Sequence, residues 1–141
     1  RGSITLNSSD PYDYPKILFN YLKEEEDLKQ TRECIKVARK ILSQPALSEH
    51  AGEEVGPGLD SQSDDELNEY IRSKADTAYH PCGTCKMGVD DMSVVDQDLK
   101  VKGIENLRVI DASIIPEIPS ANLNAPTLMI AEKGSDYILN S

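Results

Sequence analysis

Two segments decide how this chain is organised: Tyr79-His80-Pro81-Cys82-Gly83-Thr84-Cys85-Lys86-Met87-Gly88 and, further on, Asn122-Leu123-Asn124-Ala125-Pro126-Thr127. The first holds a histidine, His80, whose backbone is restricted to extended conformations by the proline that follows it. An imidazole in a fixed position suits proton transfer near neutral pH, although a single loop histidine is more often structural. The second holds two asparagines at a predicted helix start, where free amides attract negative charge; an ordinary asparagine cap is the alternative. Together the two segments outline a candidate site.

The cysteines of the first segment match the pattern C-x-x-C, which is typical of redox pairs and of half a zinc site. A structural zinc site needs four ligands, and the remaining candidates are the distant Cys34 and His80, which lies too near Cys82 and Cys85 for the usual spacing. The proline and glycine around the pair favour a loop over the helix start of a redox motif. We therefore expect no metal. The other histidine, His50, follows a polar stretch and is interpreted as a surface residue.

The composition excludes some functions. The chain has 141 residues, a net charge of -10 and a pI near 4.6, and an acidic chain is a poor ligand for nucleic acid. No apolar run approaches the roughly 20 residues that span a bilayer, and no signal peptide is visible. Three cysteines, an odd number, favour a reducing compartment, so we expect a cytoplasmic protein, with membrane association as the alternative. The start at Arg1, without methionine, suggests the carboxy-terminal fragment of a longer polypeptide.

In the first half of the chain, alternation over residues 2–9 predicts a short strand, and residues 12–22 read equally well as a buried strand or a packed loop. A helix is predicted over 27–43, with acidic residues as a solvated cap at its start and an apolar stripe formed by Leu28, Ile35, Ala38, Ile41 and Leu42. The connection over 45–63 is long enough to suggest that it packs on something outside the fragment. A capping box at Ser63 and Glu66 then predicts a helix over 64–74.

In the second half, the runs around Leu99 and Val101 and over 107–111 predict a hairpin whose second member is a buried strand. Prolines keep residues 115–121 out of helix. The last helix is predicted from Asn124, its cap, to about residue 139. One face of this helix carries Ala131, Gly134 and Ile138, and this face can approach another element closely.

Four ordered segments resemble the carboxy-terminal signature of the glucose-methanol-choline (GMC) oxidoreductases: 79–88, Val94-Val95-Asp96, 99–113 (LKVKGIENLRVIDAS) and 122–133 (NLNAPTLMIAEK). The first half resembles the choline-oxidising members of that family at Arg1-Gly2-Ser3-Ile4, Leu18-Phe19-Asn20-Tyr21, Gln44-Pro45-Ala46-Leu47 and Ala75-Asp76-Thr77-Ala78-Tyr79. The resemblance covers nearly the whole chain. It implies a flavoenzyme that uses FAD to oxidise an alcohol. The expected substrate is choline, whose oxidation to an aldehyde leads towards glycine betaine.

The resemblance also implies roles for single residues. His80 matches the active-site histidine, which is expected to deprotonate the substrate hydroxyl as hydride leaves for flavin N5, and Asn122 matches a position that holds a second histidine or an asparagine. Asp111 and Ala112 match a segment that lies against the FAD ribityl and pyrophosphate groups. The helix-start residues expected to face the flavin pyrimidine edge are Asn124, Pro126 and Thr127. An amide can orient an alkoxide but takes no proton, so His80 is the expected base.

One departure limits this assignment, because the sequence has no G-x-G-x-x-G dinucleotide fingerprint. The fragment alone is therefore expected to be inactive and free of FAD, with the amino-terminal FAD-binding portion of the same protein as its partner. The expected fold class is α+β: residues 1–78 form part of a substrate domain, with an antiparallel sheet and packed helices, and 79–141 carry the catalytic histidine and return to the FAD domain as its last strand and helix. The alternative function is a non-catalytic module that self-associates, for example as a homodimer.

Overall fold

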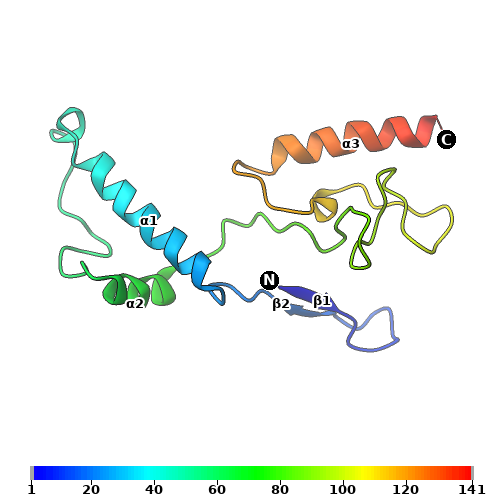
Figure 1. Cartoon of the computed structure of the whole chain (residues 1–141), viewed down its shortest axis with the longest axis horizontal. Helices are drawn as coiled ribbons and strands as arrows, with labels where there is room; N and C mark the ends of the chain where they lie inside the picture. Colours follow the sequence, from blue (N-terminus) through cyan, green and yellow to red (C-terminus); the bar gives the residue numbers. More distant parts are fainter. Residues whose placement is uncertain (1, 141) are drawn as a thin grey trace. The chain divides into compact units, whose positions relative to one another are not determined.

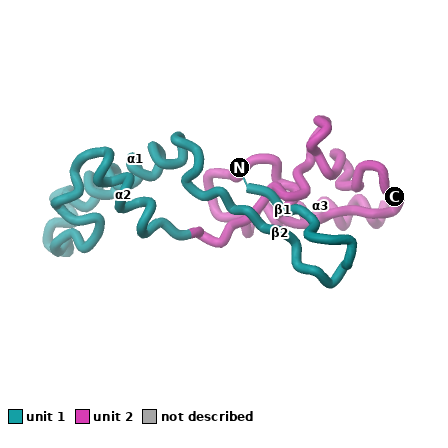
Figure 2. Tube along the Cα trace, turned by 90° about the horizontal axis from the view of Figure 1, so that it is seen from below, with its two compact units in different colours: residues 1–76 teal, residues 77–141 magenta. Residues whose placement is uncertain are grey.

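The computed structural model describes residues 2–140, so Arg1 of the segment Arg1-Gly2-Ser3-Ile4 lies outside the described residues. The chain divides into two compact units, Arg1–Asp76 and Thr77–Ser141, coloured separately in Figure 2. The fold is α+β, with three α-helices and one two-stranded antiparallel sheet among the described residues. No described helix combines the length and the apolar character that crossing a membrane requires. The assignment of the two halves to a substrate domain and an FAD domain stays a prediction.

The first unit begins with a hairpin of β1 (Ser3–Thr5) and β2 (Lys16–Leu18), which pair antiparallel with Ile4 opposite Ile17. Every residue of both strands is exposed, and so are the neighbouring rings of Phe19 and Tyr21, which stack with centroids 5.1 Å apart. The sequence predicted a longer first strand, and neither a buried strand nor a packed loop is found over 12–22. The physical reason is that a two-stranded ribbon has no second layer of its own to cover its apolar side chains.

Two helices follow in the first unit, α1 (Glu25–Leu42) and α2 (Asp64–Lys74), which pack against each other (Figure 1). The predicted capping box is confirmed, because the Glu66 amide donates to Ser63 Oγ at 3.3 Å and the Ser63 amide donates to the Glu66 carboxylate at 2.8 Å. The apolar joint is small and consists of the buried side chains Leu28, Leu67 and Ile71. The predicted stripe of α1 is buried only near its start, and the side chains of Ile41 and Leu42 at its end are exposed.

A buried arginine completes the joint between α1 and α2. Arg32 is 9% exposed, and its Nη1 donates to Asn68 Oδ1 on α2 at 2.6 Å. Its guanidinium also lies 3.6 Å from Asp64 and 3.5 Å from Glu25. Burial of a charged group is tolerated only when it is paired, and here both a carboxamide and carboxylates supply partners. Sequence analysis had placed no charged residue in this interface.

The long connection between the helices includes the short 3-10 helix η1 (Pro45–Leu47) and is held by α1 itself. The Arg39 guanidinium bonds the Glu54 carboxylate at 2.8 Å and the carbonyls of Gly58 and Ser61 at 3.0 Å each. The Arg39 guanidinium, more than any other cause, holds the pKa of Glu54 below its ordinary value. One arginine of α1 therefore anchors this segment within the unit, and the expectation that it also packs on something outside the fragment stays a prediction.

The second unit has an apolar core built mainly from irregular backbone, with the 3-10 helix η2 (Ala112–Ile114) and the helix α3 (Asn124–Leu139) as its regular elements. The buried core residues are Val95, Leu99, Ile114, Ile115, Leu123 and Ile130. Isolated bridges, such as that between Met87 and Val95, connect the segments around this core. As predicted, residues 115–121 contain no helix.

The predicted hairpin of this unit is present as a pairing but not as strands. Val101 N donates to the Leu107 carbonyl at 2.9 Å and Val109 N to the Leu99 carbonyl at 3.2 Å, yet only one bridge is formed. The prediction of a buried strand over 107–111 is wrong for this chain, since no strand forms there and Leu107 is 46% exposed. Leu99 and Asn106 both have positive φ, and such residues turn the backbone out of the pleated conformation that a longer ladder needs.

The last helix matches its predicted bounds but not its predicted cap. The residue before α3 is Leu123, which makes no side-chain capping bond, and Asn124 is the first helical residue. Further along α3, Gly134 is buried, and a Cβ added there would overlap the side chain of Ile110, whose Cδ1 would lie 2.9 Å away. The predicted close approach on this face is therefore confirmed at Gly134.

Candidate functional site

The two residues proposed from sequence as the catalytic pair lie side by side. His80 and Asn122 are 42 residues apart in the chain, and Asn122 Nδ2 lies 3.4 Å from His80 Nε2. His80 is half-buried and Asn122 is exposed. Both border a surface cavity of about 390 Å³ whose remaining lining is Ala78, Ile118, Pro119, Ser120 and Ala121. The cavity therefore presents one imidazole and one carboxamide to whatever enters it.

The backbone before His80 has an unusual conformation that sequence analysis missed. Tyr79 has φ of 58°, in the left-handed region, although it is an aromatic residue. Its amide donates to Thr77 Oγ1 at 3.0 Å. After the histidine, Gly83 also has positive φ, and a Cβ there would lie 3.2 Å from the Ile115 carbonyl oxygen. A threonine three residues before a His-Pro pair, and two before the tyrosine whose amide it accepts from, is the sequence signal that could have indicated the first of these features.

The contact between His80 and Asn122 has a defined chemical meaning. An amide Nδ2 group can only donate, so the lone pair of an unprotonated Nε2 accepts from it. That lone pair is the group that a general base uses. After the imidazole gains a proton, a half-turn of the Asn122 amide would present Oδ1, which accepts from Nε2–H. One carboxamide can thus support both protonation states of the same imidazole.

The residues expected to contact the cofactor lie at two element starts that pack together, η2 and α3. The Asp111 carboxylate accepts from the Ser113 amide at 2.7 Å and so caps η2, whose first residue is Ala112. Asn124 is exposed in the first turn of α3. Thr127 Oγ1 donates back to the Leu123 carbonyl at 2.7 Å. Asn124 therefore presents its amide to solvent, whereas the Thr127 hydroxyl is directed into its own helix.

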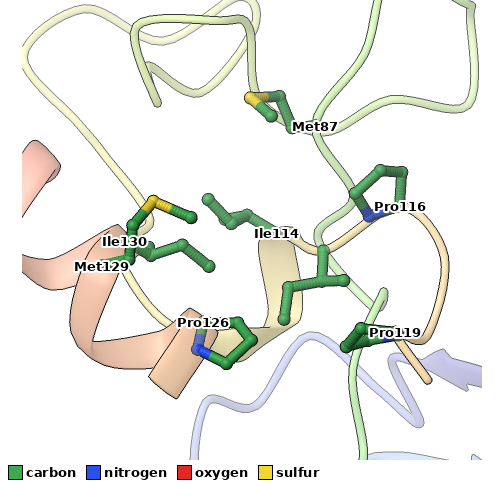
Figure 3. A pocket seen from close by; sticks show the side chains of 8 residues that line it. Met87, Ile114, Pro116, Pro119, Pro126, Met129 and Ile130 are labelled. Atoms are coloured by element: carbon green, nitrogen blue, oxygen red, sulfur yellow. The ribbon is translucent and has the colours of Figure 1, made fainter. Parts of the chain in front are cut away.

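A second cavity in this unit, of about 210 Å³, is apolar (Figure 3). Its walls come from η2, the chain after it, the first turns of α3 and the loop that carries Met87. The lining side chains are Met87, Ile114, Ile115, Pro116, Pro119, Pro126, Met129 and Ile130. Pro119 borders this cavity and the His80 cavity as well. None of the lining side chains can transfer a proton, so this cavity is suited to apolar packing rather than to chemistry.

The C-x-x-C pair lies in a loop, as predicted. Cys82 packs against the apolar core, and this burial raises the pKa of its thiol. A raised pKa disfavours the thiolate that redox chemistry and metal binding both require. Within residues 2–140, no group of three or more His, Cys, Asp or Glu side chains is placed to hold a metal ion. The absence of a metal stays a prediction.

A family model described as "GMC oxidoreductase" matches residues 1–131. Among curated proteins, the oxygen-dependent choline dehydrogenases of Klebsiella pneumoniae and Escherichia coli K12 are 53% and 51% identical over 138 residues, covering 98% of this chain. The chain spans 25% of the length of each of these relatives.

Solved structures of other proteins superpose closely on nearly the whole chain. Pyridoxine 4-oxidase from Mesorbium loti has a TM-score of 0.90 at 32% identity, with 99% of this chain and 27% of that one covered. Formate oxidase from Aspergillus oryzae RIB40, in a study of FAD modification, has a TM-score of 0.88 at 33% identity, with 99% and 24% covered. This chain therefore belongs to the GMC oxidoreductases, as the carboxy-terminal part of a member of that family.

Proposed function

We propose that this chain is the carboxy-terminal part of an FAD-dependent alcohol dehydrogenase that oxidises choline to betaine aldehyde, with His80 as its general base. The observation that carries the proposal is the 3.4 Å contact between His80 Nε2 and Asn122 Nδ2 at the edge of a cavity. The likeness to enzymes named oxygen-dependent choline dehydrogenase supports it.

In the proposed reaction, this chain handles the proton of the alcohol. His80 Nε2 accepts the hydroxyl proton, and the Asn122 amide donates a hydrogen bond to the oxygen that gains negative charge. The proton then resides on the imidazole, where Asn122 Oδ1 can accept from it. When bound in the complete protein, FAD supplies the acceptor for the two electrons that leave the alcohol carbon.

The start of α3 fits the role of holding part of that FAD. The first amides of a helix have no partners within the helix. At the start of α3, the side chain of Leu123, the preceding residue, makes no hydrogen bond to them. Pro126 has no amide hydrogen, so the backbone donors here belong to Asn124 and Ala125. Such donors and the positive end of the helix stabilise an electron-rich ring edge. Asp111 and Ala112 would lie against the ribityl and pyrophosphate groups of FAD. The amino-terminal part of the parent protein would bind the rest of the cofactor.

The proposal that choline is the substrate is supported by the relatives more than by the lining of the cavity. The lining that this chain contributes carries no carboxylate and no aromatic ring, which are the groups that recognise a trimethylammonium cation. We therefore assign recognition of the cation to the amino-terminal part of the parent, and recognition of the hydroxyl to His80 and Asn122.

The test replaces each histidine in the full-length, FAD-loaded protein. His80→Gln should lower kcat for choline by about 10²–10⁴-fold, because general-base catalysis contributes that much. His50→Gln, which changes the histidine of the other unit, should leave kcat unchanged, and both variants should keep their flavin absorbance. A His80→Gln protein with the kcat of the parent at saturating choline would contradict the proposal.

The second candidate function, an FAD-free module that only self-associates, is favoured by one observation. Among residues 2–140, more large apolar side chains are exposed than buried, and Leu6, Tyr12 and Tyr14 of the hairpin are each at least 86% exposed. Exposed apolar area of this kind drives association. Light scattering of the isolated 141-residue chain would detect a homodimer. FAD bound stoichiometrically by the full-length protein, with choline oxidation, would reject the view that association is the whole function.

A further inference from the structure

We infer that Thr77 is a positioning residue for the candidate base: its side-chain oxygen holds Tyr79 in the left-handed conformation that directs His80 towards Asn122. This inference rests on the proposed function, since it names a residue that would act through His80. Thr77 is half-buried and lies three residues before His80.

The backbone of Tyr79 needs support from its surroundings. Its φ of 58° is unfavourable for an L-residue with a large side chain, because Cβ comes close to the following carbonyl oxygen. Its side chain is 75% exposed, so burial of the ring contributes little to holding this conformation. Conformations of this kind persist only where surrounding contacts determine them, and they concentrate at functional sites.

Thr77 supplies a contact of this kind. Thr77 Oγ1 accepts from the Tyr79 amide at 3.0 Å, which closes a short turn around Ala78. Threonine is branched at Cβ and has few χ1 conformations, so its oxygen is held in place better than that of serine. Ala78, between the two bonded residues, borders the same cavity as His80.

This turn also bears on the direction of the imidazole. Pro81 restricts His80 to extended backbone from one side, and the left-handed Tyr79 fixes its direction from the other. The bond from Thr77 fixes the plane of the Ala78–Tyr79 peptide. If it were lost, that plane could rotate, and φ of Tyr79 would change with it. The Cα–Cβ direction of His80 would then change, and with it the 3.4 Å contact to Asn122. A displacement of about 1 Å at a reacting group lowers rates by about 10²-fold.

The experiment compares variants of the full-length, FAD-loaded protein. Thr77→Val keeps the shape of the side chain and removes the acceptor, so we expect kcat for choline to fall about 10- to 100-fold while the KM for choline and the FAD content stay the same. Thr77→Ser keeps the acceptor and should retain most of kcat. The matched control is Thr31→Val in α1, where the hydroxyl bonds the Asp27 carbonyl at 2.7 Å; it should leave kcat unchanged.

A rescue variant separates positioning from general structural damage. Asparagine adopts the left-handed region more readily than tyrosine, so Tyr79→Asn added to Thr77→Val should restore part of the lost kcat. Unchanged kcat in Thr77→Val, no rescue by Tyr79→Asn, or a Thr77→Val protein that unfolds or loses FAD would each overturn the inference. Failure of the proposed function is recognised separately, because His80→Gln would then also keep its kcat.

Discussion

The two units of this chain are held together in different ways. In the first unit, two regular helices share a joint of three buried apolar side chains, and two arginines, Arg32 and Arg39, bond across it and to the connecting loop. In the second unit, six buried apolar residues hold mainly irregular segments, and the His80 cavity lies on this framework. The difference indicates that the first unit depends on charged hydrogen bonds, whereas the second depends on the volume of its core. The loops that carry His80 and Asn122 are placed by this apolar core rather than by regular elements.

The sharpest test of this comparison enlarges a side chain in the core of the second unit. Gly134→Ala should destabilise the docking of α3 by about 1–3 kcal/mol, because the added Cβ would overlap Ile110 and close-packed interiors resist extra volume. Hydrogen exchange of the α3 amides, followed by mass spectrometry on the full-length protein, measures the effect. Gly52→Ala in the first unit is the control, since a Cβ there meets nothing within 4 Å. Equal exchange in both variants would contradict a volume-limited core.

A smaller effect is expected from removing a charged anchor in the first unit. Arg39→Met should lower the free energy of unfolding by about 1 kcal/mol, a small change because the pair with Glu54 is partly exposed and solvent weakens it. The main consequence should be greater mobility of residues 48–63. Limited proteolysis would show faster cleavage in that loop. Lys40→Met, which removes an exposed charge next along α1, is the matched control. Cleavage that stays as slow as in the parent would show that the loop is held by other contacts.

The smallest effect concerns a turn of the second unit and its dependence on pH. The Asp90 carboxylate contacts Lys86 Nζ at 3.0 Å and accepts from Ser93 Oγ at 2.9 Å, and with Lys86 as the largest cause these bonds lower the pKa of Asp90 from 3.8 to about 2. A lowered pKa means that the folded state favours the charged form, so its stabilising effect is complete above 3.8 and is lost as the pH falls through about 2.

We therefore expect Asp90→Asn to flatten the dependence of unfolding on pH across that interval. Urea unfolding of the full-length protein at several acidic pH values measures it. Asp91→Asn, which changes the exposed neighbour, should keep the slope of the parent. If both variants give that slope, the Asp90 turn does not contribute to the stability of the folded state.

Sequence reasoning succeeded where the signals are local. The start of α2 follows from the capping box at Ser63, and the start of α3 was predicted at Asn124 after the prolines of residues 115–121, because a helix end is decided by a few neighbouring residues. The pairing of His80 with Asn122 was foreseen through the family resemblance, since no local pattern joins residues so far apart in the chain.

Prediction from the sequence failed where contacts between distant residues, or unusual backbone angles, determine the local structure. Arg32 has the sequence context of a solvated helix residue, and only the approach of Asn68 makes it a buried one. The apolar run over 107–111 has the composition of a strand, but the positive φ values of Leu99 and Asn106 bend the pairing away after one bridge. The conformation of Tyr79 was missed for the same reason, because tyrosine carries no preference for positive φ.

The carboxamide beside His80 has a consequence for the charge that the site can hold. A carboxamide neither gains nor loses a proton in the working range of an enzyme, so Asn122 keeps the same charge whatever happens at its neighbour. In the proposed mechanism, the two side chains of this chain can therefore take up one proton from a substrate, whereas two neighbouring imidazoles could take up two.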